Sequence, residues 1–437
     1  MSINKELDFA PELPLSNAST VLSAPSVRRT ILSGSMILLL GTASVSAVNL
    51  VYNVVLARSL GAVGFGHAVS IYTLLMLLSA ITLSYQLVCS KFVAKNLTFA
   101  GKAEVYQSLH RRAWYVGAVV GAALVLASKL IASYLNLPNP LLIAWLGVGT
   151  AFYIPLGVRR GALQGMYEFR RLSVNFILEV LVKLGATLAL LALKLGVEGV
   201  VIAVSASVLV AYLSATPSPD IRIAARQGLP ASFLEGVQAI VFFIGQVIIS
   251  NIDILLVKHF FPPADAGLYA AVAVVGRVVF MASWAVVSSM FPVSAGVQQI
   301  EPQQRRVVIT PLILVASIGG LAAFGLWLLP DIVWKGLFGV GFQLGGQSWL
   351  PVLYVAATTI YCFSVVLIAY EMSRKIGNTG WLQLLFSFAI ALGIYMFHDT
   401  LRQVILVQFA LMAMLLMCVA VPFFRYKPES YTEEAGF

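Results

Sequence analysis

The stretch QVILVQFALMAMLLMCVAVPFF, residues 403–424, contains no charged side chain over its whole length. At 1.5 Å of rise per residue, a helix of this length is about 33 Å long, which matches the hydrocarbon thickness of a bilayer. Backbone N–H and C=O groups in lipid must bond one another within the segment, so a helix is the expected structure. The stretch therefore predicts a membrane-spanning helix.

Comparable apolar segments fill most of the chain. Of its 437 residues, 60% are apolar and 11% are charged, which leaves too few charges to cover a soluble enzyme or nucleic-acid-binding protein. Long unbroken runs also differ from the alternating strands of a membrane β-barrel. We therefore predict an all-α polytopic membrane protein with twelve transmembrane helices. They are 31–57, 67–90, 113–134, 139–158, 173–193, 197–215, 234–257, 266–292, 307–330, 349–370, 380–397 and 403–424.

The basic residues predict which loops face the cytoplasm. With the N terminus inside, 20 of the 28 Lys and Arg residues lie in inside segments and five lie in outside loops. Cytoplasmic loops of membrane proteins carry this excess, so both termini are predicted to be cytoplasmic. The same excess explains the net charge of +10 without a nucleic-acid partner. Residues 1–29 and 425–437 are predicted cytoplasmic tails, and 331–348 reads as a short interfacial helix.

Two segments 200 residues apart resemble each other and indicate an internal repeat. Asn53 aligns with Asp253 and Arg58 with Lys258, while Gly66 aligns with Gly267 at an offset of 201. The first and seventh helices cross in the same direction, so the halves are predicted to be parallel six-helix lobes. The N-lobe spans 30–215, a Pro- and Ser-containing connector spans 216–233, and the C-lobe spans 234–424.

Both repeated helices carry a polar stripe on one face. The first has Ser46, Asn49 and Asn53, and the seventh has Gln246, Ser250 and Asp253. These side chains either line a substrate cavity or form hydrogen bonds between helices. A cavity position is favoured for Asp253, because acids rarely face lipid.

Charges within the predicted spans are candidate site residues. Arg277 lies about 16 Å into its helix, where a guanidinium is costly unless it meets water or a partner. It is a candidate ligand for an anionic substrate group; the alternative is a structural ion pair with Asp253. Glu179 and Lys183 are four residues apart and would neutralise each other; alternatively they form a cavity pair, with Glu179 taking up a proton or Na⁺.

The ends of the repeated helices add two cations. Arg58 and Lys258 would either guide an anionic substrate outward or anchor their helices at the interface. Gly117 and Gly121 form a GxxxG pattern that is typical of close helix packing. The cysteines are far apart and the histidines are scattered, so no metal site, disulfide framework or cofactor is expected.

Four short motifs resemble those of a known family. Asn-Val-Val-Leu-Ala-Arg-Ser-Leu-Gly-Ala-Val-Gly-Phe-Gly (53–66), Gly-Ala-Leu-Gln-Gly-Met-Tyr-Glu-Phe (161–169), Asn-Ile-Asp-Ile-Leu-Leu-Val-Lys (251–258) and Leu-Phe-Gly (337–339) stand in that order. Together they resemble the polysaccharide-biosynthesis flippases of the multidrug/oligosaccharidyl-lipid/polysaccharide (MOP) exporter superfamily. The likeness spans the chain from about residue 30.

This resemblance implies a function and partners. The expected activity is flipping of an undecaprenyl-diphosphate-linked oligosaccharide to the outer leaflet of a bacterial inner membrane, for O-antigen, capsule or exopolysaccharide assembly, by alternating access. Membrane lipids, a polysaccharide polymerase and glycosyltransferases are candidate partners. The cavity charges of the family vary, so the site residues come from physical reasoning alone: Arg277, Lys183, Asn49, Asn53, Gln246, Arg58 and Lys258 for substrate, and Asp253 and Glu179 for coupling to an H⁺ or Na⁺ gradient.

Two other functions compete with this one. A multidrug or cation antiporter of the same superfamily would have a smaller cavity with buried acids and aromatic residues. An integral-membrane glycosyltransferase or polysaccharide polymerase would need a large outer loop, and the outer loops here are short. The loop motifs favour the flippase.

Overall fold

The fold of the chain is all-helical over the residues that can be described. A computed structural model describes residues 24–96, 98–218, 237–296, 301–339, 341–342, 348–374 and 379–425, and no strand occurs among them. Nine helices in this part are long and apolar enough to cross a membrane, or ten if the bent pair α2–α3 is counted as one span. The predicted helical membrane protein is confirmed, whereas the count of twelve spans and the cytoplasmic termini stay predictions.

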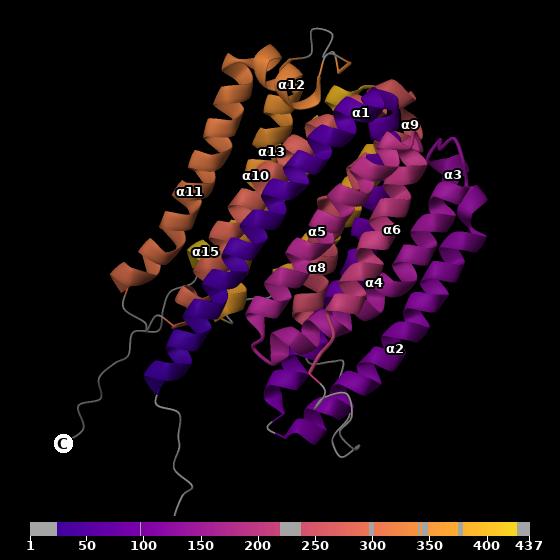
Figure 1. Cartoon of the computed structure of the whole chain (residues 1–437). Coiled ribbons are helices and arrows are strands. Elements are labelled where there is room, and N and C mark those ends of the chain that lie inside the picture. Colours follow the sequence, from indigo (N-terminus) through magenta and orange to yellow (C-terminus); the bar gives the residue numbers. More distant parts are fainter. Residues whose placement is uncertain are drawn as a thin grey trace, which may run out of the picture.

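Every predicted segment overlaps a helix in Figure 1. The helices are α1 (Ala24–Lys95), α2 (Phe99–Leu126), α3 (Ser128–Tyr134), α4 (Leu141–Gly165), α5 (Phe169–Ala192), α6 (Gly196–Ser214), α8 (Val237–Ile249), α9 (Ile252–Phe260), α10 (Pro263–Gly296), α11 (Glu301–Leu328), α12 (Pro330–Phe338), α13 (Leu350–Arg374), α14 (Gly380–Met396) and α15 (Leu401–Arg425). The predicted tails and connector lie mainly outside the described residues.

The first two predicted spans are joined within α1 by a turn at Gly61. Its backbone has φ 65° and ψ −179°, a region that residues with a Cβ rarely enter. Asn49 before the turn and Tyr72 after it both lie within 3.5 Å of one ammonium group, that of Lys183. A straight helix would separate these two positions by about 34 Å, so α1 folds back on itself.

The third predicted span differs from the structure at both ends. α2 begins at Phe99, well before residue 113, because the Thr98 side chain accepts a hydrogen bond from the Gly101 N–H at 3.1 Å and caps the helix. The helix then bends by 64° between α2 and α3. The predicted span begins only at residue 113, because hydropathy detects the part of a helix that crosses the membrane and not the polar part, residues 99–112, that precedes it.

The seventh predicted span is broken. Ser250 and Asn251 interrupt it between α8 and α9, and Asn251 has φ −140° and ψ −24°. Its side chain donates to the Val247 carbonyl at 2.7 Å, a local bond that competes with the helical pattern. Broken spans of this kind place backbone and side-chain polar groups inside a membrane protein.

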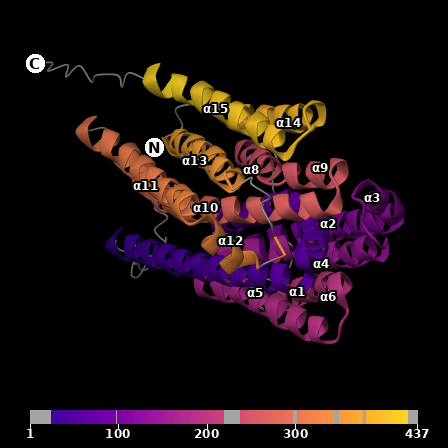
Figure 2. The ribbon, with the colours of Figure 1, turned by 90° about the horizontal axis from the view of Figure 1, so that it is seen from above.

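The helices pack as two groups, which we call the N-half (24–218) and the C-half (237–425). Figure 2 shows the indigo-to-magenta helices gathered on one side and most of the orange-to-yellow ones on the other. The main contacts between the halves are made by α1, against α8, α9, α10 and α12. Gly66 and Gly267, which the repeat aligned, face each other here: a Cβ on Gly66 would lie 2.9 Å from the Gly267 Cα.

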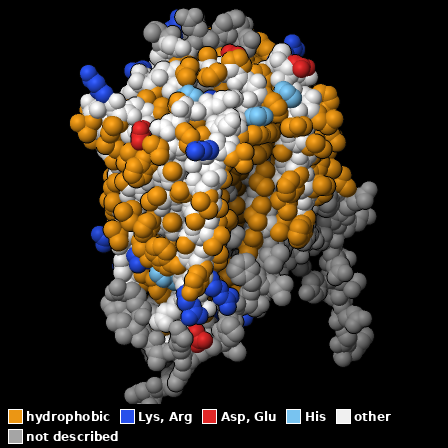
Figure 3. Space-filling view, turned by 90° about the vertical axis from the view of Figure 1, so that its right-hand side faces the viewer, with side chains coloured by type: hydrophobic (Ala, Val, Ile, Leu, Met, Phe, Trp, Pro, Cys, Tyr) orange, Lys and Arg blue, Asp and Glu red, His pale blue; other side chains and the backbone are white. Residues whose placement is uncertain are grey.

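The surface shows a broad apolar band with charged side chains near both of its ends (Figure 3). We call the end that holds Gly61, α3 and α12 the predicted outer end, since the charge distribution predicts that it faces outward. The opposite end holds Lys91 and Lys95, close to the end of α1, and Lys102, close to the start of α2.

Candidate functional site

Lys183 of α5 is buried among neutral side chains of α1. Its ammonium donates to Asn49 Oδ1 at 2.6 Å and to the Tyr72 hydroxyl at 3.5 Å. The same ammonium lies over the Tyr52 and Tyr72 rings, 4.4 and 4.6 Å from their centroids, which provides cation–π attraction. Two candidates, Lys183 and Asn49, are therefore brought together.

Arg277 of α10 bridges the two halves. One of its terminal nitrogens donates to Thr73 Oγ1 on α1 at 3.0 Å and to Asn251 Oδ1, at the break between α8 and α9, at 2.8 Å. The predicted alternative of an ion pair with Asp253 is not the arrangement observed, because the broken helix offers the Asn251 amide in its place. Arg277 is half-buried, so part of its surface stays accessible.

These two cations lie at a similar depth. Tyr72 and Thr73 are neighbours on α1 and contact Lys183 and Arg277 respectively. Thr73 is twelve residues beyond the turn at Gly61, about 18 Å along the helix, near the middle of a bilayer of about 30 Å. Among the described residues, neither cation forms an ion pair with a carboxylate. The arrangement therefore places two uncompensated positive charges at mid-membrane depth.

Asp253 lies in a separate polar cluster of the C-half. Its side chain is fully buried, and Oδ2 accepts hydrogen bonds from Tyr269 of α10 and Tyr354 of α13, each at 2.8 Å. Gln408 of α15 donates to the Tyr269 hydroxyl at 3.2 Å. The other carboxylate oxygen, Oδ1, is buried and has no hydrogen-bond partner. The cluster thus holds one carboxylate with an unused acceptor atom.

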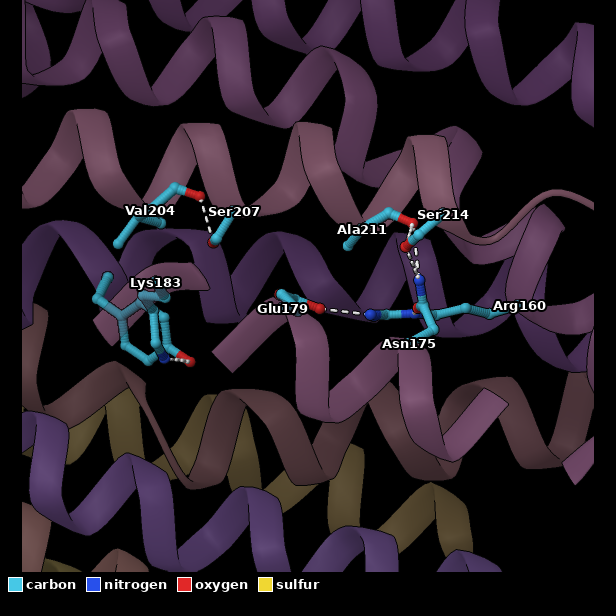
Figure 4. Close-up of polar contacts among 9 residues, drawn as sticks. Arg160, Asn175, Glu179, Lys183, Val204, Ser207, Ala211 and Ser214 are labelled. Atoms are coloured by element: carbon cyan, nitrogen blue, oxygen red, sulfur yellow. Dashed lines mark hydrogen bonds and ion pairs between the residues drawn. The ribbon is translucent and has the colours of Figure 1, made fainter. Parts of the chain in front are cut away.

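Glu179 pairs with Arg160 and not with Lys183. Arg160 of α4 donates to Glu179 Oε2, and its Nε donates to Asn175 Oδ1 at 2.7 Å. In Figure 4, Glu179 points toward Arg160 while Lys183 lies apart from both. The expected Glu179–Lys183 pair is therefore wrong, because α4 contributes a cation that helical spacing along α5 could not reveal.

The remaining candidates in the two stripes are satisfied locally or unpartnered. Asn53 donates to the Asn49 carbonyl of its own helix at 2.7 Å, and Ser46 donates to Thr42 O at 2.9 Å. Gln246 and Ser250 each have a buried side-chain oxygen without a partner. The stripe in the C-half thus keeps free hydrogen-bonding capacity, whereas that of α1 is used within the helix except at Asn49.

Contacts at the predicted outer end join the two halves and involve Arg58. The Arg58 guanidinium donates to the Gly336 carbonyl of α12. Nearby, the fully buried Phe65 ring packs edge-on against Phe338 and Phe342, with centroids 6.1 and 5.6 Å away. Arg58 therefore fixes α12 in this structure. Of the segment 331–348 that was expected to be a short interfacial helix, residues 331–338 are helical and contact α1.

A second contact at this end covers Lys258. Asn136 donates to the Lys258 and His259 carbonyls at 3.3 and 3.0 Å, and the Tyr134 ring stacks on His259 with centroids 3.8 Å apart. Lys258 itself is buried, and its ammonium has no hydrogen-bond partner. This burial does not fit the prediction that Lys258 anchors its helix at the membrane interface, which was one of the two alternatives for this residue.

Comparison with known proteins identifies the family. A family model described as "Polysaccharide biosynthesis protein" matches residues 31–298, a range that includes Lys183, Asp253 and Arg277. The chain belongs to the polysaccharide biosynthesis protein family. The resemblance stated from the sequence motifs is thereby confirmed. No curated protein sequence matches the chain.

Solved structures share the fold of this family member at low sequence identity. An inward-facing multidrug resistance MATE transporter of the MOP superfamily has a TM-score of 0.71 and 13% identity, over 90% of this chain and 100% of that one. The MATE multidrug transporter DinF-BH, solved as a ligand complex, has a TM-score of 0.65 at 13% identity, over 94% and 98%. An outward-facing MATE transporter reaches 0.60 at 13%, over 91% and 94%. Family and fold together support a membrane transporter of the MOP superfamily.

Several buried polar residues outside the candidate list could not be recognised as buried from the sequence. Arg160 and Asn175 were assigned to a loop or left unassigned, yet both are buried. Glu371 of α13 is also buried; it accepts a hydrogen bond from Thr379 at 2.5 Å, and its Oε1 is unpartnered. Glu371 ends an apolar run, as Arg160 does, so it reads as a loop residue. Within the described ranges, no group of three His, Cys, Asp or Glu side chains could hold a metal ion.

Proposed function

We propose that this family member flips an undecaprenyl-diphosphate-linked oligosaccharide from the inner to the outer leaflet of a bacterial inner membrane. The observation that carries the proposal is the pair Lys183 and Arg277, two cations at mid-membrane depth with only neutral hydrogen-bond partners in the described part of the chain. A cation kept in the membrane without a counter-ion is costly. A diphosphate would compensate both charges, since guanidinium and ammonium groups bind phosphate oxygens strongly.

Transport requires the halves to separate where they now touch. Phe65, Gly66 and Tyr134 of the N-half contact the C-half at the predicted outer end. A substrate held near Arg277 leaves outward only when these contacts open. Opening would also expose the ammonium of Lys258, which is buried in the present state. Lys258 then offers a second phosphate ligand on the outward path, as its sequence position suggested.

Asp253 is proposed to couple transport to an H⁺ or Na⁺ gradient. Its two tyrosine partners both donate to Oδ2, which leaves Oδ1 free to take a proton or contribute a ligand to Na⁺. A cation bound there would change the charge beside the break that positions Asn251 and Arg277. The function of Glu179 as a coupling acid is less favoured, because its charge is matched by Arg160.

The test uses purified protein in liposomes with fluorescent oligosaccharide linked to undecaprenyl diphosphate in the inner leaflet. Sugar that reaches the outer leaflet is scored with an impermeant probe. The expected result is protein-dependent movement of the diphosphate-linked sugar and none of the same sugar carried on uncharged polyprenol. Equal movement of both lipids would contradict the role given to the cations.

The multidrug antiporter is kept as the second function because every solved structure compared above is a multidrug transporter by its description. The same liposomes, loaded with a cationic dye and given an ion gradient, test it. Dye efflux without sugar movement would assign the buried Asp253 cluster to cation transport and make Lys183 and Arg277 structural residues.

A further inference from the structure

A pocket lined by aromatic and basic side chains opens on the flank of the N-half, apart from Lys183 and Arg277. It has a volume of about 560 Å³ and is lined by α2 and α4, with Tyr106, His110, Arg111, Trp114 and Tyr115 from α2 and Arg159 from α4. The α2 residues recur at spacings of three to five, so they occupy one face of the helix. This face lies near the end of the molecule opposite the predicted outer end.

The wall of the pocket is held in place by Tyr212 of α6. The His110 Nε2 and the Trp114 Nε1 each lie 3.2 Å from the Tyr212 hydroxyl. Arg159 donates to the Tyr212 carbonyl at 2.6 Å, and its guanidinium lies 3.6 Å from the centroid of that ring. Three helices thus fix the ring surfaces and the Arg159 guanidinium before any ligand binds.

The pocket presents positive charge that the described residues do not neutralise. Neither Arg159 nor Arg111 forms an ion pair with a carboxylate in the described part of the chain. The Nε of Arg159 is buried and has no hydrogen-bond partner, and Arg111 is exposed at the rim. Two guanidinium groups beside one pocket are suited to an anion with several oxygen atoms, because each can donate two parallel hydrogen bonds.

The depth of the pocket indicates the source of that anion. The apolar part of α2 begins at residue 113, so Arg111 and His110 lie at the boundary while Trp114 and Tyr115 lie just within it. Tryptophan and tyrosine favour this interfacial depth. Figure 3 faces the side on which α2 lies and shows Lys and Arg side chains gathered below the apolar band. This is the level of lipid headgroups on the predicted cytoplasmic side.

We propose that the pocket binds the phosphate headgroup of an anionic membrane lipid, with Arg111 and Arg159 contacting the phosphate. Basic pockets at this level bind such headgroups, and the exposed ring of Tyr115, beside the half-buried Trp114, would pack against the upper acyl chain. The site does not depend on the flippase proposal, because it shares no residue with the mid-membrane cations.

The test measures retention of phosphatidylglycerol by the purified full chain, by native mass spectrometry from mixed micelles, against phosphatidylcholine. Arg111→Gln is the test variant. The matched control is Arg112→Gln, because this change removes the same charge from the neighbouring residue, whose side chain does not line the pocket. Both side chains are exposed, so neither change should affect folding. Arg111→Gln is expected to lower phosphatidylglycerol retention about fivefold, and Arg112→Gln to leave it unchanged.

Two results would overturn the proposal. Equal loss in the two variants would mean that lipid is held by general surface charge and not by the pocket. In a second arm, inorganic phosphate or diphosphate is added to the wild-type protein at millimolar concentration. If either anion displaces the lipid, and binds equally well when no lipid is present, the ligand of the site is a soluble anion. Retention of the lipid in that arm supports the lipid headgroup as the ligand.

Discussion

Four cations buried or half-buried in the helices differ in how their charge is compensated. Arg160 has a carboxylate partner in Glu179, whereas Lys183 and Arg277 contact only amide, hydroxyl and ring groups. Lys258 has no hydrogen-bond partner for its ammonium. A paired charge serves stability, while an unpaired one is retained against its desolvation cost. This contrast separates the structural Arg160 from the proposed substrate ligands.

Arg160 and Glu179 give a prediction about stability. Glu179→Leu leaves the Arg160 guanidinium buried without a counter-charge and should lower the free energy of unfolding by about 2 kcal/mol, less than a fully buried pair would lose because the Glu179 side chain is 21% exposed. Arg160→Met combined with Glu179→Leu should recover most of this loss. Thermal unfolding in detergent measures both, and a double variant no more stable than Glu179→Leu would contradict the pairing.

Asp253 gives a prediction about coupling. Asp253→Asn keeps an acceptor for Tyr269 and Tyr354 but cannot change its charge. We expect the gradient-dependent part of transport to be lost while movement without a gradient persists. Asp265→Asn on the exposed first turn of α10 is the matched control. If transport by Asp253→Asn still responds to the H⁺ or Na⁺ gradient, Asp253 is not the coupling acid.

At the residue scale, the sequence identified the candidates but not their partners. Lys183, Arg277 and Asp253 stood out because a charge within an apolar run is rare. Their contacts come from helices far along the chain: Asn49 for Lys183, Thr73 for Arg277 and Tyr354 for Asp253. Spacing along one helix gave the wrong partner for Glu179. Contacts between helices depend on packing, which periodicity does not encode.

Helices were predicted more accurately than the interruptions between and within them. Hydropathy located a helix at every predicted segment, since each must bury its backbone polar groups. It did not detect the break at Ser250 and Asn251 or the bend between α2 and α3, because both occur inside apolar runs. The break in the α8–α9 span positions Asn251 against Arg277, so the unpredicted feature belongs to the site.

The GxxxG pattern on α2 gives a prediction at this scale. A Cβ on Gly121 would lie 2.7 Å from the Gly147 carbonyl oxygen of α4, so the two helices pack with their backbones in contact. Gly121→Leu should destabilise the protein by about 2 kcal/mol through overpacking. Gly185→Leu, on α5, meets no atom within 4 Å of its new Cβ and is the control. Equal thermal stability of the two variants would contradict this packing.

At the scale of the whole molecule, the two halves are in contact at the predicted outer end. Gly66 and Gly267 meet at the predicted outer end, where the internal repeat placed equivalent glycines. The repeat is predicted from the similar residues that surround these two glycines in the sequence. The contact that closes this end could not be predicted from the sequence, since it depends on how the two folded halves dock and not on either half alone.

Gly267 provides a test of that closure. A methyl group there would overlap the Ala62 carbonyl, and Gly267→Ala should push the outer ends apart. An overlap that costs about 1–3 kcal/mol would shift the equilibrium between the closed and the open outer end by about tenfold. The readout is the rate at which an impermeant maleimide labels Lys258→Cys in a Cys418→Ser background. Gly267→Ala should raise this rate about tenfold. Gly320→Ala, which has open space around its Cβ, should leave the labelling rate unchanged. Equal labelling rates for Gly267→Ala and Gly320→Ala would contradict closure by Gly66 and Gly267.

The measurement that tests the central claim most directly is oligosaccharide translocation in liposomes by Lys183→Gln and Arg277→Gln. Lys129→Gln, which removes an exposed cation of α3, is the matched control. Loss of a charge-assisted hydrogen bond to the diphosphate should reduce the rate for each site variant about tenfold or more, with the control at the wild-type rate. Wild-type translocation by both site variants, at equal protein content, would contradict the account.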